Sequence, residues 1–274
     1  MRRIFEKFTP EDYRFISEVV SASKEKESQK TALSSLLNDP DVLNVVLDNQ
    51  NLFQRVALDD TIFVRISPYL YFEILLRQSL RDIQREFYTL EQVGYKTRVP
   101  VFDGQKVVEI FSQDMIKDYL VELLVSFVRV ENFTILIRRG RGIYFKQTIS
   151  NMDFDFMSET SQKVEEPYRF LFVKRAADIA LFLCGVFSEQ LFATSSNFKA
   201  RRMAKALSRG EELEKYGQEL YRQACNSELA REYQLDTVLQ CLAEHFSLSK
   251  KPLNVLSDRY LCFKKYNLFD NLFN

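Results

Sequence analysis

The stretch PYRFLFVKRAADIALFLCGVFSEQLF, Pro167–Phe192, decides the fold. Apolar residues occupy most of the circumference of a helix built on it, and one narrow polar strip holds Lys174, Asp178, Gly185 and Glu189. A helix that is apolar nearly all round packs against neighbours on several sides. We therefore predict a central buried helix over residues 167–192, with Lys174 and Asp178 paired one turn apart.

The most apolar run of this stretch, Ile179–Ser188, is closed by Asp178 and Glu189. A membrane-spanning helix needs about 20 apolar residues, so this run predicts a core helix and no membrane span. The N-terminal MRRIFEKFTPEDY is charged and lacks the apolar run of a signal peptide. The four cysteines form no CxxC pair and suit a reducing compartment. We expect a cytoplasmic location.

The composition favours a helical fold. Apolar residues make up 46% of the 274 residues, and 24 Phe and 13 Tyr can fill a thick core between helices. The 7 Gly and 6 Pro are too few turn residues for a β-sandwich or barrel. Lys plus Arg and Asp plus Glu both number 38, so the chain lacks the overall basic character of many nucleic-acid-binding proteins. We predict a mainly α, multi-helix bundle.

Helical periodicity extends over most of the chain. Apolar residues at i, i+3 and i+4 spacing predict one helix from Ser67 to Val93, ended by Gly94. The C-terminal third predicts four more helices joined by short links, roughly 197–208, 211–226, 228–248 and 251–264. The polar segment 151–166 marks a loose boundary between an N-terminal part, 1–150, and a C-terminal bundle, 151–274. These are either two domains or one continuous domain.

The stretch ILIRRGRGIYFKQ, Ile135–Gln147, favours β-structure instead. Its two flanks are rich in β-branched and aromatic residues, and Gly140 and Gly142 in the centre permit positive φ. We predict one small β-hairpin over about 133–148, with its arginines at the tip.

Two basic elements are candidate anion or nucleic-acid sites. The hairpin contributes Arg138, Arg139, Arg141 and Lys146, and a predicted helix contributes Lys199, Arg201, Arg202, Lys205 and Arg209. Neither element contains an acid, and arginine binds phosphate through two parallel hydrogen bonds. Alternatively, segment 151–166, which sets five acids against one lysine, neutralises the hairpin.

The soft metal ligands of the C-terminal quarter are Cys225, Cys241, His245 and Cys262. They would suit a zinc ion, but the long gaps between them favour ordinary buried thiols. GYKT, Gly94–Thr97, lacks the strand and helix that flank a phosphate-binding loop. With one histidine and no nucleophile-elbow motif, familiar hydrolytic sites are disfavoured. We predict no metal and no cofactor.

Three functions remain open. The first is a non-enzymatic helical interaction or scaffold protein that binds another protein or itself. The second is nucleic-acid or polyphosphate binding through the two basic elements. The third is an enzyme with an unrecognised pocket, for example around Arg77, Arg81 and Arg85, which otherwise form a solvated helix face. The apolar tail YLCFKKYNLFDNLFN (260–274) is expected to dock on the protein's own body, because so apolar a terminus is rarely left in water.

Overall fold

The computed structural model describes residues 4–21, 39–59, 61–94, 97–128, 132–140, 143–192 and 211–269. This part of the chain is a multi-helix bundle with β-hairpins at its edges, so the prediction of a mainly α fold is confirmed. None of the described helices combines the length and the apolar character that a membrane span requires.

Helix α9, Tyr168–Val186, is the central helix that the sequence predicts. It packs against α7 (Asp114–Val128), α8 (Phe154–Ser161), α11 (Glu211–Cys225) and α15 (Lys251–Val255). The helix is shorter than predicted, because the backbone leaves the helical conformation at Phe187. Residues Ser188–Phe192 then form the 3-10 helix η3.

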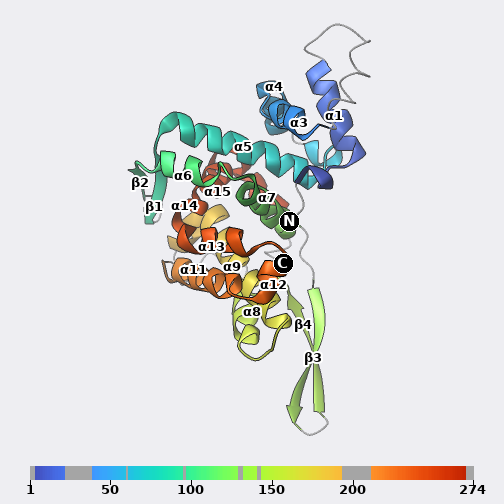
Figure 1. Cartoon of the computed structure of the whole chain (residues 1–274), viewed down its shortest axis with the longest axis vertical. Coiled ribbons are helices and arrows are strands. Elements are labelled where there is room, and N and C mark those ends of the chain that lie inside the picture. The colour runs from blue at the N-terminus through green and yellow to red at the C-terminus, as the bar shows by residue number, and fades with distance from the viewer. Residues whose placement is uncertain are drawn as a thin grey trace.

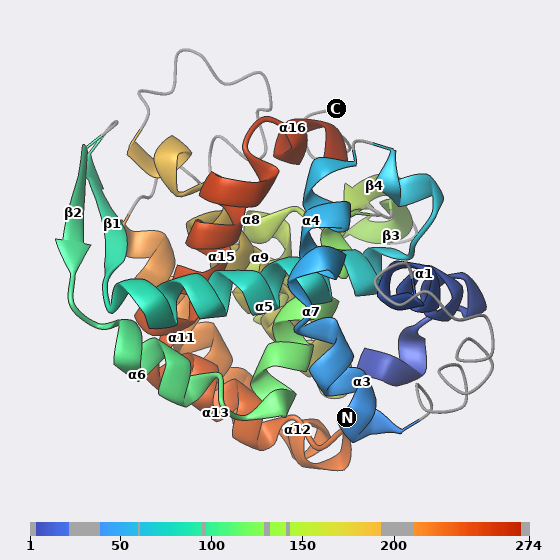
Figure 2. The ribbon, with the colours of Figure 1, turned by 90° about the horizontal axis from the view of Figure 1, so that it is seen from above.

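The N-terminal helices gather at one end of the long helix α5, Pro68–Glu86 (Figures 1 and 2). They are η1 (Ile4–Lys7), α1 (Pro10–Ser21), α3 (Pro40–Leu47), α4 (Gln50–Leu58) and η2 (Ile62–Val64). Ser67 caps α5 through the backbone N–H of Leu70, and Pro68 occupies its first turn. The buried Asp12 ties α1 to this cap, since its carboxylate accepts from the Ser67 N–H at 2.7 Å.

The helix predicted over Ser67–Val93 is wrong in its last turns. Phe87 adopts a left-handed conformation, with φ of 60°, and its N–H bonds to the Ile83 carbonyl, which ends α5 at Glu86. The chain then forms strand β1 (Thr89–Gly94), which pairs antiparallel with β2 (Thr97–Val101). Phe87 and Leu90 continue the helical spacing but are exposed, because tertiary pairing overrides the local pattern here.

The predicted hairpin is confirmed as a second ribbon. Strand β3, Asn132–Gly140, pairs antiparallel with β4, Ile143–Ser150. The sequence therefore predicts one hairpin correctly and misses β1–β2, which lies at the far end of α5 from the N-terminal helices (Figure 2). Helix α6, Gly104–Ile110, follows β2 and leads into α7.

The C-terminal helices are more broken than predicted. The stretch 228–248 divides into α12 (Glu228–Glu232), α13 (Asp236–Glu244) and the first part of α14 (Phe246–Ser249). The positive φ of Gln234 separates the first two. After α15 come the π-helix η5 (Leu256–Leu261) and α16 (Lys264–Leu268). The helix predicted over 197–208 lies outside the described residues.

Aromatic rings join both parts of the chain in one core. Phe182 of α9 contacts Phe127 of α7 and Phe269, with ring centroids 4.1 and 5.0 Å apart. Phe269 is fully buried and stacks on Phe72 of α5. As far as residue 269, the apolar tail therefore docks on the body as predicted. The division of the chain near residue 150 stays a prediction.

Candidate functional site

The β3–β4 arm, residues 132–140 and 143–150, projects from the helical body, and its strands extend beyond the lowest helices in Figure 1. Arg138 pairs with Tyr144 close to the turn, and the side chain of Lys146 is exposed. The side chains of Arg138 and Arg139 and all of Arg141 lie outside the described part. The hairpin itself is therefore confirmed, while the position of its basic side chains at the tip and what they contact stay predictions.

The second basic element lies wholly outside the described residues. This applies to Lys199, Arg201, Arg202, Lys205 and Arg209. Whether the two basic elements converge on one surface therefore stays a prediction.

The four soft metal ligands do not form a site. Cys225, Cys241, His245 and Cys262 are all described, and no group of three or more metal-binding side chains converges in the described ranges. All four cysteines are free thiols, and Cys184 is the buried one among them.

Two members of the arginine row on α5 bind α3, while the third, Arg85, is exposed. Arg77 is buried and donates to Glu73, also on α5, at 2.6 Å, and to Asn44 Oδ1 of α3 at 2.5 Å. Arg81 donates to the Asp48 carbonyl at the end of α3. Since both side chains serve to attach α3 to α5, an enzyme pocket around this row has no support.

A different polar site lies where β1, the C-terminal end of α9, α11 and α15 meet. Together with η3, these elements line a cavity of about 410 Å³ that is open to solvent. The residues that give it its chemistry are Glu91, Cys184, Glu214, Lys250, Lys251 and Asn254.

Lys250 links two carboxylates at this cavity. Its Nζ lies 2.5 Å from Glu214 Oε2 and 3.3 Å from Glu91 Oε1. Burial lowers the pKa of Lys250, but the charge and hydrogen bond of Glu214, together with the charge of Glu91, leave the pKa raised above its ordinary value. Lys250 is therefore an ammonium ion held between α11 and β1.

The neighbouring Lys251 is 2% exposed and binds the same strand. Its Nζ lies 2.7 Å from Asp103 Oδ2 and 3.4 Å from Glu91 Oε2, and it donates to Thr89 Oγ1 at 3.0 Å. The Thr89 hydroxyl in turn donates to Asp103 Oδ1 at 2.7 Å. These bonds fix the start of β1 and the end of β2 to α15.

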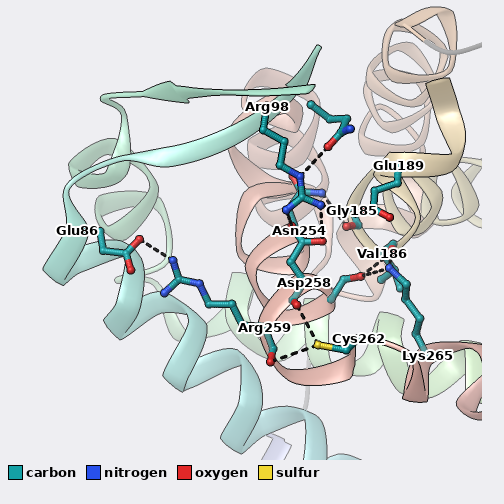
Figure 3. A network of polar contacts seen from close by, with 12 residues as sticks. Glu86, Arg98, Gly185, Val186, Glu189, Asn254, Asp258, Arg259, Cys262 and Lys265 are labelled. Atoms are coloured by element: carbon teal, nitrogen blue, oxygen red, sulfur yellow. Dashed lines mark hydrogen bonds and ion pairs between the residues drawn. The ribbon is translucent and has the colours of Figure 1, made fainter. Parts of the chain in front are cut away.

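Asn254 shapes the opposite wall of the cavity. Its Nδ2 donates to the carbonyls of Cys184 and Gly185 at 3.0 and 2.7 Å, at the end of α9 (Figure 3). Burial raises the pKa of Cys184 to about 12, so the thiol is neutral at pH 7 and behaves as an apolar wall.

Next to the cavity, Arg98 of β2 reaches between Glu189 of η3 and Asp258 of η5 (Figure 3). Its guanidinium lies 2.5 Å from Glu189 Oε1 and 2.9 Å from Asp258 Oδ2, and its Nε donates to Gln92 at 2.7 Å. Burial raises the pKa of Asp258, which the positive charge of Arg98 opposes. Arg98 thereby attaches β2 to the C-terminal helices.

Lys265 occupies the lower part of the same network (Figure 3). Its Nζ donates to Ser257 Oγ at 2.9 Å and to the Val186 carbonyl at 3.3 Å, and burial lowers its pKa. Both partners are neutral, so Lys265 satisfies the carbonyl left open at the end of α9 rather than pairing directly with a carboxylate.

A second buried cluster surrounds Asp178, next to a smaller cavity of about 270 Å³. Asp178 accepts from Lys174 at 2.8 Å, as predicted, and from the hydroxyls of Tyr119 and Tyr221 at 2.5 and 2.8 Å. Burial, with the charge of Asp178, raises the pKa of both tyrosines well above the ordinary value. This cluster joins α7, α9 and α11, and its carboxylate accepts three side-chain hydrogen bonds.

No protein family, curated protein or solved structure matches this chain.

The sequence does not reveal the polar cavity, because its charges come together from distant segments. One local signal exists in the adjacent pair Lys250 and Lys251. Lys250 precedes α15 and Lys251 is its first residue, where positive charge opposes the helix dipole. Two lysines at this position indicate acidic partners from elsewhere in the chain, but not which ones.

Proposed function

We propose that this chain is a non-enzymatic interaction or scaffold protein that binds another protein through the β3–β4 arm. One observation carries the proposal: the two strands pair with each other and make no more than slight contact with any other described element. A two-stranded ribbon is at best marginally stable alone in water. A partner would supply the packing surface that the described elements of the body do not.

The pairing register supports a protein partner over a nucleic acid. Its backbone partners are Phe133 with Ile149, Ile135 with Gln147 and Ile137 with Phe145, so apolar residues recur along both strands. Strands rich in apolar residues suit a protein partner, and each strand has an outer edge to which a partner strand can add. The arginines near the turn would meet acidic groups at the rim.

The same proposal includes a cytoplasmic location. The four free thiols support it, because a reducing compartment keeps cysteines unpaired.

The test is site-specific photo-crosslinking in the cells that make the protein. A photoreactive amino acid at Ile137 should give one crosslinked protein, while the same amino acid at the exposed Val64, on the body, should not. The identified partner is then purified and titrated against the intact protein and a variant in which a Gly-Ser turn replaces residues 134–148. Loss of binding in the arm-less variant supports the proposal.

Equal affinity of the partner for both proteins would overturn it. Crosslinks to RNA or DNA instead, with an affinity that falls steeply as salt rises, would point to the basic residues and nucleic acid.

A further inference from the structure

The polar cavity between β1, α9, α11 and α15 is large enough to bind a ligand. At about 410 Å³, and open to solvent, it has room for a small organic molecule. Its position is independent of the β3–β4 arm, since its described lining residues belong to other elements. A ligand bound here would therefore add a function to the one proposed for the arm.

The charges that line the cavity are paired, with one exception. The carboxylates of Glu91 and Glu214 each lie within 3.4 Å of the Nζ of a buried lysine. Lys251 also binds Asp103, which is not part of the lining. The exposed Lys215 of α11 lines the cavity too, and it has no carboxylate partner among the described residues. Two carboxylates thus face three ammonium groups in the lining, and the unpaired charge is positive.

Several hydrogen-bond donors of the lining also lack an acceptor among the described residues. They are the ammonium group of Lys215, the amide of Gln218 and the hydroxyl of Ser188. Gln218 lies three residues after Lys215, so both side chains are on one face of α11. Lys250 adds a donor, because its ammonium has three N–H groups and two carboxylate partners. A ligand group that accepts hydrogen bonds and carries negative charge matches these donors.

The lining favours a carboxylate over a phosphate. A single unpaired ammonium group suits an anion with one charge. Phosphate carries more charge at pH 7 and is commonly bound by the paired N–H groups of arginine, and no arginine is among the described lining residues.

The cavity also has an apolar wall. Val93, Leu191 and the thiol of Cys184 line it, and the thiol is neutral because burial raises its pKa to about 12. A short alkyl chain attached to the carboxylate would pack against these side chains. We propose that this cavity binds a small organic carboxylate, with the free donors of α11 and η3 binding the charged end and the apolar wall contacting the carbon chain.

The experiment uses butyrate as the probe, with n-butanol as its neutral counterpart and n-butylammonium as the counterpart of opposite charge. Ligand-observed NMR titration of the full chain should show saturable binding of butyrate, with a Kd about tenfold lower than that of either counterpart. Substitution Lys215→Gln should raise the Kd of butyrate about threefold, since water screens part of this charge. The matched control Arg222→Gln, at an exposed position of the same helix, should leave the Kd unchanged.

A second variant gives a larger effect. Val93 is half exposed at the cavity, so Val93→Glu would place a carboxylate there without removing any ion pair. It should abolish butyrate binding while unfolding cooperatively like the parent protein. No saturable binding of butyrate, binding of butanol or butylammonium as tight as that of butyrate, or unchanged binding in both variants would each overturn the proposal. Tighter binding of inorganic phosphate than of butyrate would overturn the assignment to a carboxylate.

Discussion

The β1–β2 and β3–β4 hairpins are both antiparallel ribbons with a register shift beside the turn, at Gln92–Gly94 and at Arg138–Gly140. The first is attached to the body at both strands, through Lys251 at its base and Arg98 on β2. The second pairs mainly with itself. Two ribbons of the same kind therefore differ in what holds them, and the one with little contact to the other described elements is the one that we propose to bind a partner.

The difference between the two hairpins is tested most directly by substituting Lys251. Replacing it by Met leaves Asp103 without its buried counter-charge and Thr89 without a donor, so we expect a loss of about 3–5 kcal/mol in the free energy of unfolding. Urea titration followed by circular dichroism measures this. Lys163→Met, at an exposed position after α8, is the control and should change stability by less than about 0.5 kcal/mol. A small loss at Lys251 would mean that its ion pairs do not hold the hairpin.

The next largest effect is expected at Gly104, which follows β2. A Cβ there would lie 2.7 Å from the Phe87 carbonyl carbon and 2.9 Å from its oxygen, so Gly104→Ala forces the end of β2 away from α5. We expect a cost of about 1–3 kcal/mol by urea titration. Gly94→Ala is the matched control, because its nearest neighbour would be Thr97 Cβ at 3.7 Å. Equal costs at both glycines would contradict the close docking of β1–β2.

Substituting Arg98 should lower the free energy of unfolding by a smaller amount, and that amount should depend on pH. Arg98→Met removes the guanidinium from Asp258, and we expect a cost of about 1–2 kcal/mol at pH 7. Burial already raises the pKa of Asp258 in the folded state, and losing Arg98 should raise it further. The folded variant then takes up its proton earlier as pH falls, so the cost should shrink on acidification through that pKa.

Unfolding curves of both proteins between pH 7 and pH 4 test this prediction. Arg222→Met removes an exposed ion pair with Glu219 and should cost little at any pH. A cost for Arg98→Met that is independent of pH would show that Asp258 does not feel the guanidinium.

The smallest effect is expected on the projecting arm. Lys146 is exposed on β4, and its backbone partner across the ribbon is Leu136 of β3. Lys251, by contrast, attaches the β1–β2 hairpin to the body. Lys146→Ala should change the free energy of unfolding by less than about 0.5 kcal/mol. Thermal unfolding of the two proteins side by side measures the difference. A loss comparable to that of Lys251→Met would show that the arm is part of the cooperative unit.

The sequence predicts those elements whose evidence is local. The all-round apolar pattern of 167–192 identifies α9, and Lys174 and Asp178 pair as their spacing requires. The β-branched runs and glycines of 133–148 identify the arm. Local pattern fails at Phe87 and Leu90, because a left-handed residue and strand pairing end a helix whose apolar spacing continues.

The polar cavity could not be predicted, because its chemistry depends on distance in space. Lys251 and Glu91 are 160 positions apart in sequence, yet their side chains meet at 3.4 Å. The contacts of the arginine row on α5 could not be predicted for the same reason. The spacing of the arginines indicates a charged face of α5. Only the position of α3 shows that Arg77 on this face binds Asn44 of α3.

The sequence alone therefore determines a helical body, its central helix and a basic hairpin, since periodicity and turn residues act within a few positions. The tertiary structure decides that the body holds one ribbon while the other projects, and that charged side chains from β1, from α11 and from the start of α15 meet at one cavity. Both features depend on which distant segments pack together. Burial of an unpaired charge or of an unpaired backbone group costs free energy, so the packing must supply a partner for each.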